Sequence, residues 1–233
     1  MTTVKVFEVG GCVRDRILGV PPNDIDFAVE APSFEAMFEF VKATTKSIFL
    51  SKPEFLTIRA MTRDNEAVDF VMCRKDGIYT DGRRPDSVEP GDILSDLGRR
   101  DFTAGAIAID SDGKFIDPHG GIKDIEAKLL RCVGITDDRF NEDSLRILRA
   151  MRFSITKGFT LHYDIEHVFS TPEVWVPKLA SVSKERIREE LMKCLKFNTA
   201  ETLRFLRDRP EQWTDALFGG DLWLKPTFEE RKR

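Results

Sequence analysis

The sequence predicts an α/β domain followed by a small all-helical part. Up to about residue 137, short apolar runs with strand-like alternation stand between helical patterns, which is typical of a sheet covered by helices. From about Asp138 the strand signals stop and apolar residues recur at helical spacing. We therefore expect an α/β head over residues 1–137 and a helical part over residues 138–233.

Length, charge and hydropathy restrict the class of protein. The chain has 233 residues, enough for one large core or two modest domains. Its net charge of −4 argues against indiscriminate nucleic-acid binding through the whole surface, but leaves room for a local basic stripe. No stretch resembles a membrane span, and the first residues, MTTVKVFEVGG, read as a strand and a turn and not as a signal peptide. We expect a cytoplasmic protein, and the sequence leaves its oligomeric state open.

Each element of the head has a local signal. Strand patterns cover residues 4–9, 26–29, 48–50, 55–61, 67–73 and a run ending at 109, with which 114–116 would pair. Helical patterns cover residues 12–18, 34–43 and 122–128. Gly19 and Pro21 stop the first helix, and Ser33 is a suitable N-cap for the second. Residues 74–90 are polar and rich in Gly, Pro and Asp, so we expect a long loop, which in a compact domain is commonly functional.

The helical part has its own signals. Apolar residues recur at helical spacing over residues 141–154, 163–169, 184–195 and 200–207. Thr199 is a favourable N-cap for the last of these helices, and Ser183 is a weaker one for the helix before it. The cysteines are far apart and form no CxxC pair, which predicts reduced buried thiols at Cys12, Cys73, Cys132 and Cys194. The three histidines match no metal or triad spacing, and we assign them no catalytic role.

The most informative segment is residues 10–30, GGCVRDRILGVPPNDIDFAVE. The glycine pair at its start opens a turn into a helix, and backbone N–H groups there can receive phosphate oxygens. Asp24 and Asp26 follow, one residue apart, and alternate residues of a strand share a face. Neighbouring carboxylates suit a Mg²⁺ ion that also holds substrate phosphates, whereas the alternative is an acidic pair in a solvated turn. We favour a metal site for a nucleoside triphosphate.

Further charged residues can complete such a site. Asp69 lies in the apolar run AVDFV, either as a third carboxylate that accepts the proton of an attacking hydroxyl or as an acid on the wet face of an edge strand. Arg99, Arg100 and Asp101 follow a helical turn. They form either a structural corner or a corner that aims one guanidinium at a triphosphate.

In the helical part, one row of charged residues stands out. Asp143, Arg146, Arg149 and Arg152 are spaced by three and form one ridge of the expected helix, while the intervening apolar residues take the buried side. The ridge is either a solvated face with i,i+3 ion pairs or a rigid carboxylate–guanidinium pair that presents acceptors and donors to the edge of a base.

These motifs together resemble the class II tRNA nucleotidyltransferase and bacterial poly(A) polymerase family, within the DNA polymerase beta superfamily. The similarity extends over residues 9–159 in ordered blocks: GGCVRDRILG with NDIDFAV, VDFVMCR, YTDGRRPDSV, DLGRRDFTAGAIAID, DPHGGIKDIEAKLLRCVG and FNEDSLRILRAMRF with KGF. The resemblance implies the mixed-sheet nucleotidyltransferase head of that superfamily, followed by a helical neck and a truncated body.

The resemblance also implies an activity. Such enzymes join the α-phosphate of CTP or ATP to the 3′-hydroxyl of a tRNA or another RNA and release pyrophosphate. Asp24 and Asp26 would hold two Mg²⁺ ions, and Asp69 stands at the place of the third acid. The incoming nucleotide would bind Gly10, Gly11, Arg14, Arg100, Asp143, Arg146, Arg149 and Arg152. Within this set, Asp143 and Arg146 would read the base edge, so that the protein acts as the template, and residues 74–90 match the flexible loop used in switching from C to A.

Three departures from the family pattern stand out. Gly105 occupies a place where Asn is usual, and Asp69 is one methylene shorter than the usual Glu. The sequence also ends at Arg233, where family members continue into a long helical body and tail. This predicts either a minimal enzyme, such as a virus could encode, or an enzyme that grips its RNA through the acceptor end alone.

The sequence therefore favours an enzyme that adds C, C and A, or part of that set, to tRNA 3′ ends. The first alternative is an oligo(A) or poly(A) polymerase, because the Glu-Asp-x-x-Arg block occurs in both groups. The second alternative is an inactive head that binds RNA or nucleotides. The retained loop over residues 74–90 favours CCA addition over the first alternative, and the intact acids and arginines disfavour the second.

Overall fold

The computed structural model describes residues 4–22, 24–77 and 86–219. The chain divides into two compact units, the first ending at Glu142 and the second beginning at Asp143. The division falls slightly later than the boundary predicted after residue 137, because helix α5 (Thr136–Glu142) belongs to the first unit.

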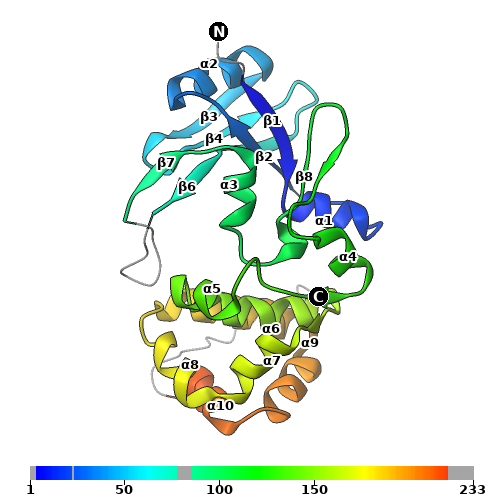
Figure 1. Cartoon of the computed structure of the whole chain (residues 1–233), viewed down its shortest axis with the longest axis vertical. Helices are drawn as coiled ribbons and strands as arrows, with labels where there is room; N and C mark the ends of the chain where they lie inside the picture. Colours follow the sequence, from blue (N-terminus) through cyan, green and yellow to red (C-terminus); the bar gives the residue numbers. More distant parts are fainter. Residues whose placement is uncertain (1–3, 23, 78–85, 220–233) are drawn as a thin grey trace, which may run out of the picture. The chain divides into compact units, whose positions relative to one another are not determined.

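The first unit is built on a mixed seven-stranded sheet with the strand order β3-β4-β5-β2-β1-β8-β9 (Figure 1). Its strands are β1 (Lys5–Val9), β2 (Ile25–Glu30), β3 (Ser47–Lys52), β4 (Thr57–Met61), β5 (Ala67–Met72), β8 (Ala108–Ile109) and β9 (Phe115–Ile116). Neighbouring strands are antiparallel except β2 and β5, which run parallel. The predicted α/β class with a mixed sheet, followed by a helical part, is confirmed.

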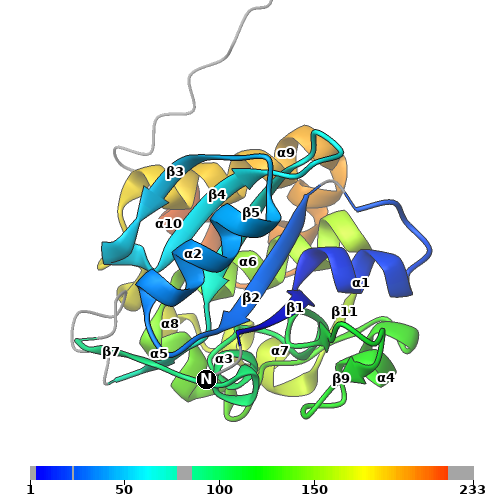
Figure 2. The same cartoon turned by 90° about the horizontal axis from the view of Figure 1, so that it is seen from above.

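The two faces of this sheet bury different clusters. Helix α2 (Phe34–Thr44) lies across one face, over β4 and β5 (Figure 2). Its Met37 and Val41 pack there against residues such as Ile58 and Phe70. The other face carries Phe7, Val9 and Ala28, which pack with Ile93 and Leu97 of α3 (Ile93–Gly98). Because alternate strand residues face opposite sides, this sorting also fixes which face receives each charged residue.

Shorter elements complete the first unit. They are α1 (Gly11–Ile17), α4 (Gly121–Glu126), β10 (Leu129–Leu130) and the 3-10 turns Pro53–Phe55 and Thr103–Gly105. The N-cap predicted for α2 is confirmed, since Ser33 Oγ accepts the N–H of Ala36 at 3.2 Å. The predicted pairing of the run ending at Ile109 with the following strand is also confirmed.

The segment 74–90 was predicted as a loop, and this is wrong at both of its described ends. Strand β6 (Arg74–Asp76) pairs antiparallel with β7 (Val88–Pro90). Strands of only three residues carry no readable alternation, so the pairing is visible only in the tertiary structure. The central residues, 78–85, lie outside the described part of the chain.

The described residues of the second unit are mainly helical. Its elements are α6 (Leu145–Lys157), β11 (Thr160–Leu161), α7 (Tyr163–Ser170), α8 (Pro172–Leu179), α9 (Lys184–Arg207) and α10 (Glu211–Phe218). Helices α6 and α9 pack against each other. Trp213 of α10 is fully buried and donates its indole N–H to the carbonyl of Phe169 at 2.8 Å. None of the helices in the described ranges has both the length and the apolar character needed to cross a membrane.

Two predictions about α6 and α9 are wrong in detail. The helix expected over 141–154 is interrupted, because the Asp143 carboxylate accepts the N–H of Leu145 at 3.1 Å and starts a new helix there. The N-cap expected at Thr199 is Asn198, whose non-helical backbone breaks α9 and whose side chain accepts the N–H of Glu201 at 3.0 Å. Thr199 instead donates its hydroxyl to the carbonyl of Leu195.

Helices α8 and α10 were missed by the sequence interpretation. Two prolines, Pro172 and Pro177, obscure α8, although a proline in the first turn of a helix needs no hydrogen-bond donor. Helix α10 follows α9 after a short connection and lacks a side-chain cap, so its start carries no local signal.

Candidate active site

The register of the sheet places three charged residues side by side. Asp26 of β2 pairs with Asp69 of β5, and Asp69 in turn pairs with Arg59 of β4. Directly opposite residues of neighbouring strands share a face and lie within contact distance. Asp26 is two residues from Ala28, so this row is on the α3 side of the sheet. The structure therefore makes neighbours of two of the predicted acids.

Asp24 lies one residue before β2 and joins the row. One cavity of about 230 Å³ is lined by Asp24, Ile25, Asp26, Arg59, Ala67 and Asp69. The three carboxylates predicted to act together thus line one cavity, and an arginine that the sequence interpretation did not consider lines it with them.

Burial raises the pKa of Asp26 above its usual value. Repulsion from Asp69, and to a smaller extent from Asp24, adds to this effect, whereas Arg100 and Arg59 oppose it. A carboxylate in this position is stabilised by any further positive charge that enters the cavity. The electrostatics of the site therefore favour a bound cation.

Asp69 is held by Arg59. The Arg59 Nε donates to Oδ1 of Asp69 at 2.5 Å, and its Nη2 donates to Oδ2 at 2.6 Å, so the guanidinium fork engages both carboxylate oxygens. The Arg59 side chain is half exposed, at 50%, against 25% for Asp69. The pair lies at the open rim of the site.

The residues fit a magnesium site built on two carboxylates. Among the described residues, no three His, Cys, Asp or Glu side chains converge to hold an ion together, and Asp69 directs both oxygens to Arg59. Asp24 and Asp26 nevertheless supply hard oxygen donors at a cavity where positive charge is favourable. Mg²⁺ is commonly held by one or two carboxylates, with water and substrate phosphates as its other ligands.

The glycine turn begins beside these acids, since Val9 pairs with Asp26 at the end of β1. Gly10 has a φ of +76°, in the region that favours glycine. A Cβ at Gly10 would stand 2.9 Å from Nη1 of Arg100. The structure therefore places two predicted nucleotide-binding residues, Gly10 and Arg100, in contact.

Arg100 is fixed by a buried carboxylate. Asp96 of α3, 1% exposed, receives Nε and Nη2 of Arg100 on Oδ2 at 3.2 and 2.8 Å. It receives the same two nitrogens of Arg99 on Oδ1 at 3.0 and 2.6 Å. Nη1 of Arg100 donates to the Gly105 carbonyl at 3.2 Å. Burial acts to raise the pKa of Asp96, but Arg100 and Arg99 hold it below its usual value.

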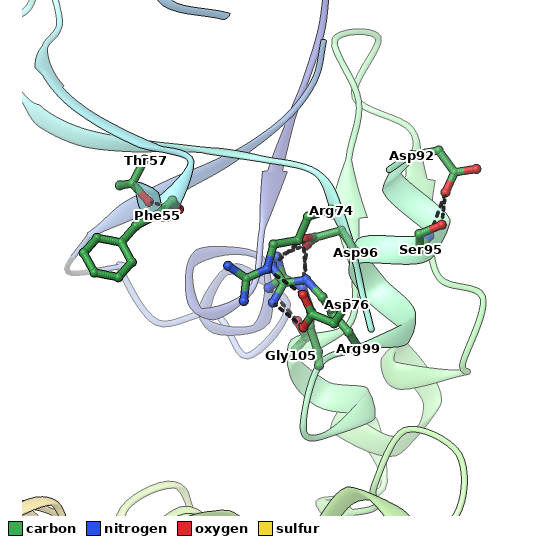
Figure 3. A network of polar contacts seen from close by, with 10 residues as sticks. Phe55, Thr57, Arg74, Asp76, Asp92, Ser95, Asp96, Arg99 and Gly105 are labelled. Atoms are coloured by element: carbon green, nitrogen blue, oxygen red, sulfur yellow. Dashed lines mark hydrogen bonds and ion pairs between the residues drawn. The ribbon is translucent and has the colours of Figure 1, made fainter. Parts of the chain in front are cut away.

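The same network reaches the β6–β7 pair. Nη1 of Arg99 lies 3.8 Å from Oδ2 of Asp76 in β6, and Nε of Arg74 lies 2.9 Å from Oδ1 of the same carboxylate (Figure 3). Ion pairs therefore connect the described base of the 74–90 segment to the arginines behind the glycine turn.

Arg14 lies next to the glycine turn. It is buried, and its Nε and Nη2 lie 2.8 Å from Oδ1 of Asp15. A Cβ at Gly11 would stand 3.6 Å from Nη2 of Arg14. Contact of Arg14 or Gly11 with a nucleotide stays a prediction.

The backbone conformation at position 105, where Gly105 replaces the usual Asn, does not require a glycine. Its φ is not in the left-handed region, and a Cβ there would meet only Oδ1 of Asp101 within 4 Å, at 3.9 Å. The position would accommodate a side chain.

In the second unit, Asp143 is held in place by Arg186 of α9. Nη2 of Arg186 donates to Oδ2 of Asp143 at 2.7 Å, and Nη1 donates to Oδ1 at 3.4 Å. Oδ1 also accepts the N–H of Leu145. Arg146 follows on the first turn of α6 and is partly exposed. The predicted base-reading carboxylate is therefore held in a fixed orientation by hydrogen bonds.

The other two residues of the ridge have structural contacts. Arg152 donates its Nε to Oε2 of Glu190 at 2.5 Å, and Glu190 is only 3% exposed. Arg149 and Arg152 also lie over the ring of Phe153, at 6.0 and 4.7 Å from its centroid. Arg152 thus links α6 to α9, and nucleotide binding by Arg149 and Arg152 stays a prediction.

Several of these partners were missed by the sequence interpretation. A turn over residues 62–66 pairs Met61 with Ala67. Counting two residues back from Met61 and two forward from Ala67 would have placed Arg59 opposite Asp69. Asp96 stands three and four residues before the two arginines that it binds, a spacing readable on a helix. Arg186 and Glu190 lie far along the chain from their partners and carry no local signal.

The fold and this site define a class of protein. The mixed sheet presents two carboxylates at the start of one strand and a third on its parallel neighbour, and an arginine contacts the glycine turn. This combination defines the head of a nucleotidyltransferase. The family described as Poly A polymerase head domain matches residues 6–131, more than half of the chain. The chain therefore belongs to the family of the poly(A) polymerase head domain and the CCA-adding enzymes.

Individual relatives agree with this assignment. The chain is 40% identical over 192 residues to the CCA-adding enzyme of Geobacillus thermodenitrificans, an alignment that covers 82% of this chain and 45% of the relative. It is 36% identical over 192 residues to the CCA-adding enzyme of Lactiplantibacillus plantarum, covering 82% and 45%. The chain thus spans about half the length of the curated relatives that it matches.

Solved structures are similar over the same part. The crystal structure of Bacillus stearothermophilus CCA-adding enzyme in complex with CTP has a TM-score of 0.75 at 33% identity, covering 88% of this chain and 48% of that one. A tRNA nucleotidyltransferase complexed with a primer tRNA and an incoming ATP analog has a TM-score of 0.76 at 29% identity, covering 95% and 61%.

Proposed function

We propose that this chain is a template-independent RNA nucleotidyltransferase that adds C, C and A, or part of that set, to tRNA 3′ ends. Its substrates are CTP and ATP, and pyrophosphate is released. The observation that carries the proposal is the row of Asp24, Asp26 and Asp69 around one cavity beside the glycine turn. The CTP and tRNA complexes of the similar enzymes support the choice of substrates.

In this proposal each residue of the head has a defined task. Asp24 and Asp26 hold Mg²⁺, expected as two ions, which when bound stabilises the attacking and leaving oxygens of the phosphoryl transfer. To Asp69 we assign acceptance of the proton of the attacking 3′-hydroxyl. Arg100 and the turn at Gly10 bind the triphosphate, and Asp96 keeps the Arg100 guanidinium pointed at that turn.

In the helical unit we assign the base reading to Asp143 and Arg146. A carboxylate accepts hydrogen bonds from an exocyclic amino group, and a guanidinium donates to ring acceptors. Cytosine and adenine each carry an amino group on their pairing edge, so both suit this pair. Arg186 is the residue that keeps Asp143 oriented.

Two other functions remain as alternatives. An oligo(A) or poly(A) polymerase stays an alternative, because the family matched over residues 6–131 is described by the poly(A) polymerase head domain. An inactive RNA- or nucleotide-binding module is disfavoured by the intact acids of the cavity.

One assay separates the three functions. Purified protein is incubated with Mg²⁺, one labelled nucleoside triphosphate at a time or in pairs, and tRNAs ending before or within CCA. Addition of C and then A, followed by a stop, supports CCA addition. Long tails from ATP alone support the polymerase, and nucleotide binding without incorporation supports the inactive module.

Variants of the acids test the catalytic assignment. Asp24→Ala and Asp26→Ala should each abolish incorporation while the circular dichroism spectrum stays that of the wild type. Asp64→Ala removes an exposed carboxylate from the turn between β4 and β5 and is the matched control. Incorporation near the wild-type rate in either active-site variant would refute the assignment.

The base-reading role has its own test. Arg146→Ala should reduce the preference for CTP and ATP over the other two nucleotides more than it weakens triphosphate binding. Equal weakening for all four nucleotides would contradict this role. Arg204→Ala, which removes an exposed arginine of α9 paired with Glu201, serves as the control.

A further inference from the structure

Arg59 is the feature of the site that the proposed function leaves unexplained. It lines the same cavity as Asp24, Asp26 and Asp69. Its place is fixed by the sheet, because it lies directly opposite Asp69 in the β4–β5 ladder. A permanent positive charge therefore stands within the cavity where a divalent cation would bind.

The contact between Arg59 and Asp69 is of the kind that competes with a metal. Both carboxylate oxygens receive a guanidinium N–H, at 2.5 and 2.6 Å. A bidentate pair of this geometry is the strongest ion pair that a carboxylate forms with a side chain. While it persists, the carboxylate oxygens of Asp69 are directed toward β4 and not toward Asp26.

The exposure of Arg59 makes the contact reversible. Half of its side chain is open to solvent, so the guanidinium can move into water without the penalty that a buried charge would pay. The hydrogen bonds to Asp69 raise the pKa of Arg59 most, and the negative charge of Asp69 raises it further. Asp24 and Asp26 make smaller contributions in the same direction. All three acids thus attract this one cation.

We propose that Arg59 is a built-in counter-ion of the acidic cavity, which holds Asp69 and leaves Asp24 and Asp26 as the metal ligands until it moves away. Arg59 is then a positioning residue that sets the affinity of the site for a divalent cation and decides when Asp69 becomes available. The inference rests on the proposed function, because it takes the cavity to be the metal site.

The proposal predicts that removing the Arg59 charge strengthens metal binding. Two strand spacings separate β4 from β2, so the Arg59 charge acts on the ion over about 10 Å. At the dielectric constant of water, loss of this charge gives about fourfold tighter binding of a divalent ion. The measurement is a titration of the purified full chain with Mn²⁺ alone, by electron paramagnetic resonance or calorimetry. Arg59→Gln should bind more tightly by this factor, and Arg59→Lys, which keeps the charge, should stay near the wild type.

The matched control is Arg63→Ala. Arg63 is exposed, lies at the end of the same pair of strands, and donates to the carbonyl of Ala43 away from the cavity. Its removal changes the net charge of the chain by the same amount and should leave Mn²⁺ affinity unchanged. Equal strengthening in Arg63→Ala and Arg59→Gln would reduce the effect to net charge and overturn the proposal.

The availability of Asp69 is tested by a double-mutant cycle. Asp69→Asn should weaken Mn²⁺ binding more in the Arg59→Gln background than in the wild type, because only there is Asp69 free to face the ion. Equal losses in the two backgrounds would overturn the proposal. If Arg59→Gln only destabilised the fold at this site, it would not bind Mn²⁺ more tightly than the wild type.

A further variant separates this inference from the proposed function. Asp24→Asn combined with Asp26→Asn should abolish Mn²⁺ binding at the cavity. If binding survives, the metal assignment falls and this inference falls with it. If binding is lost there but Arg59→Gln binds Mn²⁺ no more tightly than the wild type, the inference alone is refuted.

Discussion

Replacing Asp96 by asparagine should destabilise the first unit and weaken triphosphate binding. The Asp96 carboxylate is 1% exposed and is shared by two guanidinium groups. An amide of the same shape offers one acceptor and places a donor against the other guanidinium. Both Arg99 and Arg100 would lose the charge that balances them, and Arg100 would lose the contact that aims it at Gly10.

The size of this effect follows from the burial of the three groups. Removing one partner of a buried ion pair costs about 3–5 kcal/mol, because an uncompensated charge remains. The arginine side chains are 23% and 21% exposed, so water partly compensates them, and we expect the lower end, about 3 kcal/mol. For a protein of this size that corresponds to a fall in Tm of about 10 °C.

The assay is urea unfolding of Asp96→Asn followed by circular dichroism, with the affinity for CTP measured on the folded protein. Asp92→Asn is the matched control. Asp92 lies at the N-terminus of the same helix, is exposed, and accepts the N–H and hydroxyl of Ser95 (Figure 3). Asparagine caps a helix about as well as aspartate, so this substitution should cost well under about 1 kcal/mol and should leave CTP affinity unchanged. A cost for Asp96→Asn no larger than that of the control would refute the reasoning.

The pH dependence gives a second check on Asp96. Its pKa is lowered in the folded state, so its stabilising contribution is present above the pKa of the unfolded chain and is lost as pH falls through the folded value. The difference in stability between wild type and Asp96→Asn should therefore be full at pH 7 and shrink in acid. A difference in stability that stays constant from pH 7 down to about pH 3, below the usual Asp pKa of about 3.9, would contradict the charge argument.

Three more predictions test other parts of the structure. Asp26→Asn should raise Tm at pH 7 while abolishing incorporation, because the pKa of Asp26 is raised and its ionised form therefore disfavours folding above the unfolded pKa; a lower Tm would contradict this. Glu190→Gln should cost the second unit about 2–3 kcal/mol in urea unfolding, since the carboxylate is buried and binds charged groups; a cost below about 1 kcal/mol would count against it. Gly121→Ala should prevent folding of the first unit, because its Cβ would lie 2.1 Å from the carbonyl oxygen of Thr103, whereas Gly113→Ala, which meets nothing, should cost only about 1 kcal/mol; soluble, two-state unfolding of both variants would refute the packing argument.

The sequence by itself determined the fold class, most of the longer elements and the identity of the acids. Alternation in β2 and β5 and the helical period of α2 and α6 are local properties, so they can be read without the structure. The glycine pair and the carboxylates at Asp24 and Asp26 are close in sequence, so they can be recognised together as one motif.

Only the tertiary structure decided which partners these residues have. Asp69 meets Asp26 because β2 and β5 are parallel neighbours in a sheet whose order is not the order of the chain. Arg186 and Glu190 acquired their roles in the same way, through contacts between segments distant in sequence, whereas Arg59 meets Asp69 across the β4–β5 hairpin. The physical reason is that the spacing of apolar residues along the chain determines whether a segment forms a helix or a strand. An ion pair, in contrast, forms with whichever oppositely charged side chain the packing brings within reach.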